Sequence, residues 1–163
     1  MSEYERATTS MTFGSLPEPI RAAVRAKAES LQLTVADDAP AFLTHSRKLK
    51  RSGMLNRMLG GDQDKAHDTA LVIGAKDVLV ATHGEKRGTA VLAARLDDTD
   101  VSAMSERLSE LSGISADDGM SVNGFPVSGT EGNGRGSFYV GLGPPEGAAA
   151  RTALIEAIRA AKA

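Results

Sequence analysis

The sequence predicts a mainly β fold of the α+β class with a helix at its C-terminal end, and three observations lead to this prediction. Short runs of β-favouring residues recur along the chain, and most of its 17 glycines fall between them, where turns are needed. The last of these runs, 136–143, is followed by Pro144-Pro145 and then by a segment with helical periodicity. Aromatic residues make up only 4% of the chain, so the core is expected to be aliphatic.

The C-terminal helix is predicted over 148–161. Its apolar residues Ala150, Leu154 and Ile158 recur every four positions and therefore share one face of a helix. Pro145 is expected in the first turn, where the missing N–H of proline is no loss. We expect this helix to cover the open end of a small barrel formed by the strands.

Length and composition limit the classes of protein to consider. The 163 residues suit one domain, and a net charge of −2 gives no general attraction to nucleic acid. The chain has no cysteine, which excludes disulfides and thiolate metal sites. The N-terminus has no basic stretch followed by an apolar one, and no apolar run approaches the roughly 20 residues of a membrane span. We therefore expect a soluble, cytoplasmic protein without a nucleic-acid partner.

The N-terminal part of the chain is expected to form an arm and a helix. Residues 1–15 are polar and show no periodicity, which is typical of a flexible arm. Pro17 and Pro19 then open a helix, 17–32, whose apolar residues lie on one face. We expect this helix to pack on the outside of a single domain that spans 16–163.

The middle of the chain carries the clearest strand signals. A first strand is predicted at 40–47. Three further strands are predicted at 69–73, 78–82 and 89–96, separated by turns at 74–77 and 84–88. Three consecutive antiparallel strands of this kind make a meander.

A helix is predicted to interrupt the strands near 100–112. Asp97, Asp98 and Asp100 can cap it, apolar residues follow at helical spacing, and Gly113 ends the run. Further on, Asn123-Gly124 lies between two short apolar runs and predicts a two-residue hairpin turn.

The order of these elements resembles that of bacterial pleckstrin-homology-like (PH-like) domains. The resemblance rests on the strand 136–142, the Pro/Glu loop and helix that follow it, and the meander 69–96, and it covers about residues 39–162. It implies a barrel of about seven antiparallel strands in two near-orthogonal sheets, capped by the C-terminal helix. The N-terminal helix and the helix near 100–112 are extra to such a barrel. They leave open a five-stranded sheet with helices on its faces, as in profilin-like or roadblock-like proteins.

The segment 47–59 is the strongest candidate for a binding surface. It holds five cations and no acid, and an apolar stripe of methionine and leucine follows its basic run. Clustered cations attract phosphates or an anionic membrane, and methionines suit adaptable protein contacts. Two further cations lie on the turn 84–88. The candidate partner-binding residues are Arg47, Lys48, Lys50, Arg51, Met54, Leu55, Arg57, Met58, Lys86 and Arg87.

The remaining polar clusters have structural explanations. The glycine-rich stretch 129–136 leads into a strand rather than a helix, which favours a hairpin turn over a phosphate loop. His45, His67 and His83 each lie alone near a strand end, whereas a metal site needs several ligands to converge. The acids 97–100 suit a helix start, and the sequence contains no nucleophile elbow. We therefore predict no cofactor, no metal and no catalytic residue.

These observations, together with the resemblance, favour a non-catalytic binding or assembly module that contacts a protein partner or a second copy of itself. A simpler interpretation makes the segment 47–59 a short helix that packs on the barrel and leaves its cations in solvent. Two further hypotheses stay open. One is binding of an anionic lipid or phosphate ligand through 47–59, and the second is a small enzyme of roadblock-like or profilin-like fold with dispersed site residues.

Overall fold

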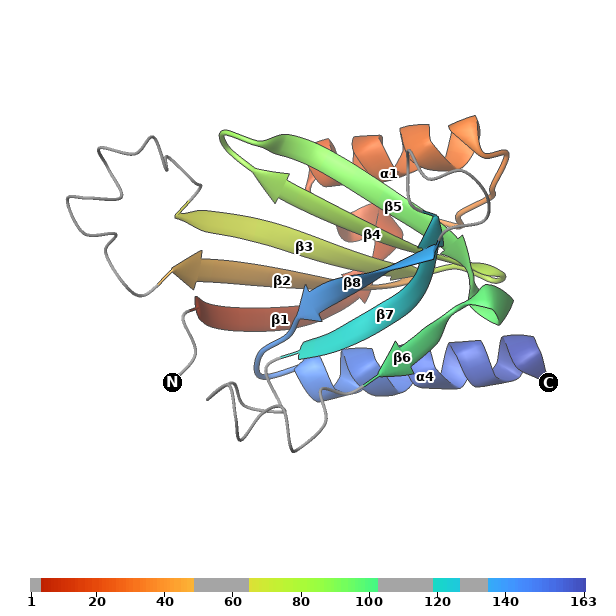
Figure 1. Cartoon of the computed structure of the whole chain (residues 1–163). Coiled ribbons are helices and arrows are strands. Elements are labelled where there is room, and N and C mark those ends of the chain that lie inside the picture. The colour runs from red at the N-terminus through yellow and green to blue at the C-terminus, as the bar shows by residue number, and fades with distance from the viewer. Residues whose placement is uncertain (1–3, 49–64, 103–118, 127–134) are drawn as a thin grey trace.

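Two antiparallel sheets and two long helices form the described part of this computed structural model, which comprises residues 4–48, 65–102, 119–126 and 135–163 (Figure 1). The first sheet has the order β1 (Tyr4–Thr12), β2 (Pro40–Lys48), β3 (Ala66–Ile73), β4 (Asp77–Gly84) and β5 (Gly88–Arg95). The second has the order β6 (Asp100–Ser102), β7 (Gly119–Pro126) and β8 (Arg135–Gly141). The helices are α1 (Glu18–Ser30) and α4 (Gly147–Lys162), and two short 3-10 turns lie at Phe13–Ser15 and Leu96–Asp98. This arrangement confirms the predicted mainly β, α+β class.

The predicted meander is confirmed, together with the strand before it. β2 to β5 follow one another in the sheet as they do in the sequence, and their register is continuous. The hydrophobic runs of β3 and β4 are buried on both faces of the sheet, from Ala70 to Ile73 and from Val78 to Ala81. Both faces therefore need a covering layer.

The two layers that cover the first sheet differ in kind. On one face, which we call the inner face, Phe42, Leu71 and Val80 pack against Met120, Val122 and Val140 of the second sheet, and α4 adds the predicted Ala150, Leu154 and Ile158. On the opposite, outer face, α1 covers a second apolar cluster with Ile20, Val24 and Ala28. The N-terminal helix therefore buries a second apolar cluster against the outer face of the sheet.

The predicted flexible arm is wrong from Tyr4 onward. Residues 4–12 form β1, which pairs with β2 over its whole length. The sequence does not indicate this strand because its side chains are mostly polar. On the inner face, Thr8 meets the hydroxyl of Thr44 and not an apolar neighbour. With Arg6, Thr8 and Ser10 on the inner face and only one large apolar residue, Met11, on the outer face, the strand gives no clear alternation of hydrophobicity in the sequence.

Two predictions in the middle of the chain are also corrected. A helix is expected near 100–112, but the first residues of this range form strand β6, Asp100–Ser102. The rest of the range lies outside the described residues. Asn123 and Gly124 do not turn the chain but lie inside β7, where a bulge shifts the register between Asn123 and Phe125. Gly124 has φ 112°, and a Cβ there would lie 2.4 Å from the carbonyl oxygen of Asp98. The glycine therefore allows the backbone of β7 to lie close to the backbone of Asp98.

The segment between β8 and α4 joins the C-terminal part of the chain to β1. The helix begins at Gly147, so Pro145 lies before its first turn and not in it as predicted, and Pro145 forms a parallel bridge with Thr8. The backbone N–H of Thr8 donates to Pro144 (3.0 Å), and the N–H of Glu146 donates to Thr8 (3.2 Å). The Thr8 hydroxyl also accepts the N–H of Gly143 at 2.9 Å. One buried threonine thus connects β1 to the entry of α4.

Candidate functional site

The polar part of the inner face lies toward the end of the first sheet where β2 ends and β3 begins. Every second residue of each strand points to this face, and the cross-strand register sets which of them are neighbours. Beyond the apolar core, the first row across the sheet consists of Thr8, Thr44, Thr69 and Thr82. The first three are buried and Thr82 is half-buried, so solvent exposure along the row increases at β4. This hydroxyl row separates the apolar core from the basic residues described next.

Basic side chains occupy the next rows of the inner face. Arg6, Ser46 and His67 lie side by side on β1, β2 and β3, and Ser46 is only 1% exposed. Nε of Arg6 and Nδ1 of His67 are buried atoms. At the margin, the backbone N–H of Lys48 donates to the carbonyl of Lys65 at 2.8 Å, which brings two lysines to neighbouring strand ends.

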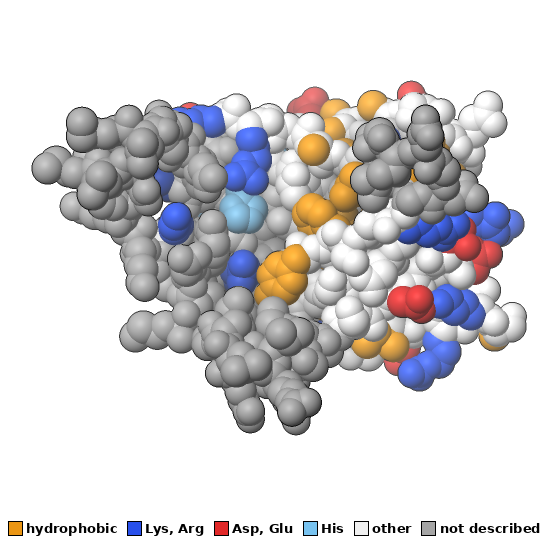
Figure 2. Space-filling model, in the orientation of Figure 1, with side chains coloured by type: hydrophobic (Ala, Val, Ile, Leu, Met, Phe, Trp, Pro, Cys, Tyr) orange, Lys and Arg blue, Asp and Glu red, His pale blue; other side chains and the backbone are white. Residues whose placement is uncertain are grey.

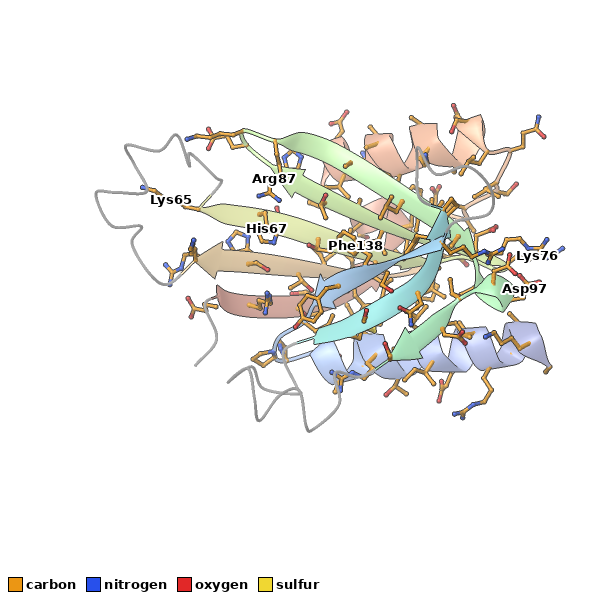
Figure 3. The ribbon with its side chains drawn as sticks, viewed as in Figure 1. Lys65, His67, Lys76, Arg87, Asp97 and Phe138 are labelled. Carbon is orange, nitrogen blue, oxygen red and sulfur yellow. The ribbon has the colours of Figure 1, made fainter. Side chains whose placement is uncertain are left out.

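The β4–β5 turn adds two more cations at the same end of the sheet. Gly84 pairs with Gly88, and Lys86 and Arg87 occupy the exposed turn between them. Figure 3 shows Arg87 of this turn and His67 of β3 toward the same end of the sheet, with Lys65 directly before β3. We call Arg6, Lys48, Lys65, His67, Lys86 and Arg87 the basic end. In Figure 2 basic side chains gather around a histidine on one side of the visible face.

The outer face at this end has a different charge pattern. Arg47 of β2 forms an ion pair with Glu5 of β1, and Nδ1 of His45 lies 2.7 Å from the carboxylate of Asp68 on β3. Both pairs are cross-strand neighbours, which brings opposite charges together. Among the described residues, the carboxylates of these strand ends therefore face outward, and a further acid nearby is Glu85 in the turn. The inner face keeps cations and hydroxyls.

An aromatic side chain lies beside the basic end. Phe138 of β8 is half-buried and packs against the inner core together with Leu92 of β5. In Figure 3 Phe138 lies on β8, which crosses the inner face of the first sheet. Nearby, the guanidinium carbon of Arg6 lies 5.8 Å from the centre of the Tyr139 ring. The arrangement offers positive charge, hydroxyl donors and one apolar wall, a set suited to binding an anionic group.

The structure brings together part of the site predicted from the sequence. Lys48, Lys86 and Arg87 share the basic end, whereas Arg47 points to the outer face and pairs with Glu5. The rest of the predicted residues, Lys50, Arg51, Met54, Leu55, Arg57 and Met58, lie outside the described residues. Sequence reasoning missed Arg6, Lys65 and His67, because only the register of β1, β2 and β3 places them on one face. The Lys-x-His alternation at the start of β3 was the available signal.

The opposite end of the sheet carries both signs of charge, arranged in pairs. Arg95 pairs with Asp97 at 2.8 Å, Arg135 with Asp98 at 3.3 Å, and Lys162 with Asp100 at 2.5 Å. The acidic run predicted to cap a helix thus joins β5 and β8 to the 3-10 turn through Asp97 and Asp98, and α4 to β6 through Asp100. Burial raises the pKa of Asp77 above its usual value, although the nearby Arg95 acts in the opposite direction.

A hollow of about 670 Å³ lies near the start of α1. The ion pair Arg25–Asp37 (3.1 Å) lines it, and the guanidinium of Arg21 donates to the carbonyl of Gly14 at 2.9 Å. The hollow therefore carries both signs of charge, with Asp37 and Asp38 beside its two arginines.

The remaining histidine contacts are local. Nδ1 of His83 lies 2.6 Å from the hydroxyl of Thr89 across the β4–β5 pair. The described ranges contain no group of three or more metal-ligating side chains. Across those same ranges, neither helix has the length and apolar character needed to cross a membrane. Comparisons with protein-family models, with curated proteins and with solved structures found no match. The residues of the site therefore carry the functional argument by themselves.

Proposed function

We propose that the protein is a non-catalytic binding module of PH-like type whose basic end holds an anionic partner, most simply an acidic segment of another protein. The PH-like part of this proposal is supported by two antiparallel sheets that enclose one core and by a C-terminal helix that packs on that core. The binding part is supported by the basic end.

The observation that carries the proposal is the separation of charge between the two faces of one strand end. Arg47 and His45 face outward and meet the carboxylates of Glu5 and Asp68. Lys48 and its neighbours in the basic end lie beside hydroxyl side chains, and among the described residues one acid, Glu85, shares the turn that carries Lys86 and Arg87. This local excess of positive charge occurs on a chain whose net charge is −2, so it does not follow from overall composition.

Charge reversal tests the proposal. The variant Lys65→Glu/Arg87→Glu changes the charge of the basic end by four units, and Lys76→Glu/Arg159→Glu makes the same change at exposed cations elsewhere. Binding of both variants and the wild type to immobilised poly-L-glutamate is measured at about 50 and 200 mM salt. We expect wild-type binding that weakens as salt rises, a loss of at least about tenfold in the first variant, and a change below about threefold in the second.

Two outcomes would contradict the proposal. Equal losses in the two variants would show a response to net charge alone. Absence of wild-type binding at the lower salt would remove anion recognition at this surface. Sedimentation with anionic phosphatidylserine vesicles gives the membrane hypothesis its own readout, and binding to vesicles without binding to poly-L-glutamate would favour a membrane over an acidic protein segment.

A further inference from the structure

The outer edge of β5 is an unpaired strand edge within the described part of the chain. β5 is the last strand of the first sheet, and its ladder partner there is β4. The ladder runs from Asp77–Arg95 to Gly84–Gly88 without a bulge. A strand edge of this kind presents a row of backbone N–H and C=O groups to any chain that can pair with them.

The remaining strand edges of the described residues carry features that discourage pairing. β1 has charged residues at Glu5 and Arg6 and is bridged to Pro145 at its centre. β6 is only three residues long. The side chain of Arg6 lies against β8, where a Cβ on Gly141 would be 2.3 Å from its Nε. Short length, charge and cover are the usual protections of an edge.

β5 lacks these protections over most of its length. From Gly88 to Ala94 it contains neither a charged residue nor a proline. Its first half is also the more open: Gly88 and Ala90 are exposed, and Leu92 is half-buried. An uncharged, unbulged edge is a liability unless a partner uses it, so this edge is favoured as an interface.

We propose that the anionic partner docks as an extended acidic segment that adds a sixth strand to the free edge of β5. This inference rests on the proposed function and specifies the form of the partner. The open stretch Gly88–Leu92 spans about 17 Å at roughly 3.4 Å per residue, which is the length of an ordinary strand. Backbone hydrogen bonds provide the pairing, and the neighbouring cations select the acidic sequence.

Charge complementarity fixes the direction of the added strand. Lys86 and Arg87 stand immediately before Gly88, so the acidic residues of the partner lie beside that end of β5. The sheet is antiparallel throughout, and an antiparallel addition places the C-terminal end of the partner segment there. Lys65, which directly precedes β3, lies about three strand spacings or roughly 14 Å from the added strand, so it adds only weakly to the positive field there.

A capped heptapeptide, Thr-Val-Thr-Val-Thr-Glu-Glu, is the probe for this docking mode. It combines strand-forming residues with acids at its C-terminal end. The full chain, labelled with ¹⁵N, is titrated with the peptide, and amide hydrogen exchange is followed by NMR. We expect exchange at least about tenfold slower at the outward-facing amides of residues 89–92 near saturation. We also expect binding at least about fivefold weaker in Lys86→Gln/Arg87→Gln than in the control Lys27→Gln/Lys76→Gln.

Peptides that cannot form edge hydrogen bonds separate this inference from the proposed function. One is N-methylated on both valines and a second on all three threonines, so at least one of them loses the donors that would face β5. Loss of binding by one of them supports strand addition. Equal binding of all three peptides, with unchanged exchange in β5, overturns strand addition but leaves anion binding intact. Failure of the peptides and of poly-L-glutamate together overturns both.

Discussion

Replacing Thr8 by valine tests the claim that one buried hydroxyl joins the N-terminal strand to the entry of the C-terminal helix. Thr8 is fully buried, and its hydroxyl contacts the hydroxyl of Thr44 at 2.8 Å and accepts the N–H of Gly143 at 2.9 Å. Valine keeps the shape of threonine but offers neither donor nor acceptor. The variant therefore leaves the part-buried Gly143 amide without this acceptor.

The size of the effect follows from these two contacts. An orphaned buried donor costs about 1–3 kcal/mol, and the lost contact with Thr44 about 0.5–1.5 kcal/mol more. The extra methyl group of valine returns up to about 0.8 kcal/mol. We expect Thr8→Val to lower the free energy of unfolding by about 2 kcal/mol, which at an m-value of about 2 kcal/mol/M shifts the urea midpoint by about 1 M.

Two further variants make the Thr8 test specific. Thr8→Ser keeps the hydroxyl and loses one buried methyl, so it should cost only about 1 kcal/mol. The double variant Thr8→Val/Thr44→Val should cost less than the sum of the single changes, because it removes both partners of one contact. The reasoning would be refuted if urea unfolding gave Thr8→Val and Thr8→Ser the same free energy of unfolding. Strict additivity of the Thr8→Val and Thr44→Val effects in the double variant would also refute it.

Three other changes test the fold. Gly124→Ala should lower the free energy of unfolding in urea by at least about 3 kcal/mol, because φ 112° and the carbonyl of Asp98 both exclude a Cβ. Gly88→Ala, with φ 70° and open space around the Cβ, should lower it by roughly 1–2 kcal/mol. Equal losses in the two variants would contradict this. Leu154→Ala should cost about 2–5 kcal/mol, and a loss below about 1 kcal/mol would show that α4 is not part of the core. Asp77 has a pKa raised above 3.8 in the folded state, so its contribution to stability is present below pH 3.8 and is lost as pH rises through the folded pKa. Relative to the wild type, Asp77→Asn should therefore gain stability in urea unfolding as pH rises from below 3.8 to about 7, and the reverse trend would contradict the assigned shift.

The meander and both helices could be predicted because local signals agree with the tertiary structure there. Each of β3, β4 and β5 has a β-favouring run bounded by turn residues, and the four-residue spacing in α4 matches its buried face. β1 escaped prediction because its inner-facing side chains are polar: Thr8 meets the hydroxyl of Thr44, and Arg6 lies over the ring of Tyr139. The Asn123-Gly124 signal was overridden by a tertiary contact, the approach of the Asp98 backbone.

The candidate site could be predicted only where its residues are adjacent in sequence. Lys48 belonged to a visible basic run, and the pair on the β4–β5 turn stood out between two glycines. Arg6, Lys65 and His67 come together through cross-strand register, which no local pattern encodes. The separation of Arg47 from Lys48 shows the same point, since neighbours on a strand face opposite sides.

The most direct test of the account is to locate the binding surface on the molecule itself. The amide resonances of the ¹⁵N-labelled full chain are followed while an acidic polymer, poly-L-glutamate, is added. We expect the largest shifts among the described residues to fall at 46–48, 65–67 and 84–88, and to disappear in Lys65→Glu/Arg87→Glu. Shifts concentrated at the hollow near Arg21 and Arg25, or spread evenly over exposed cations, would contradict it.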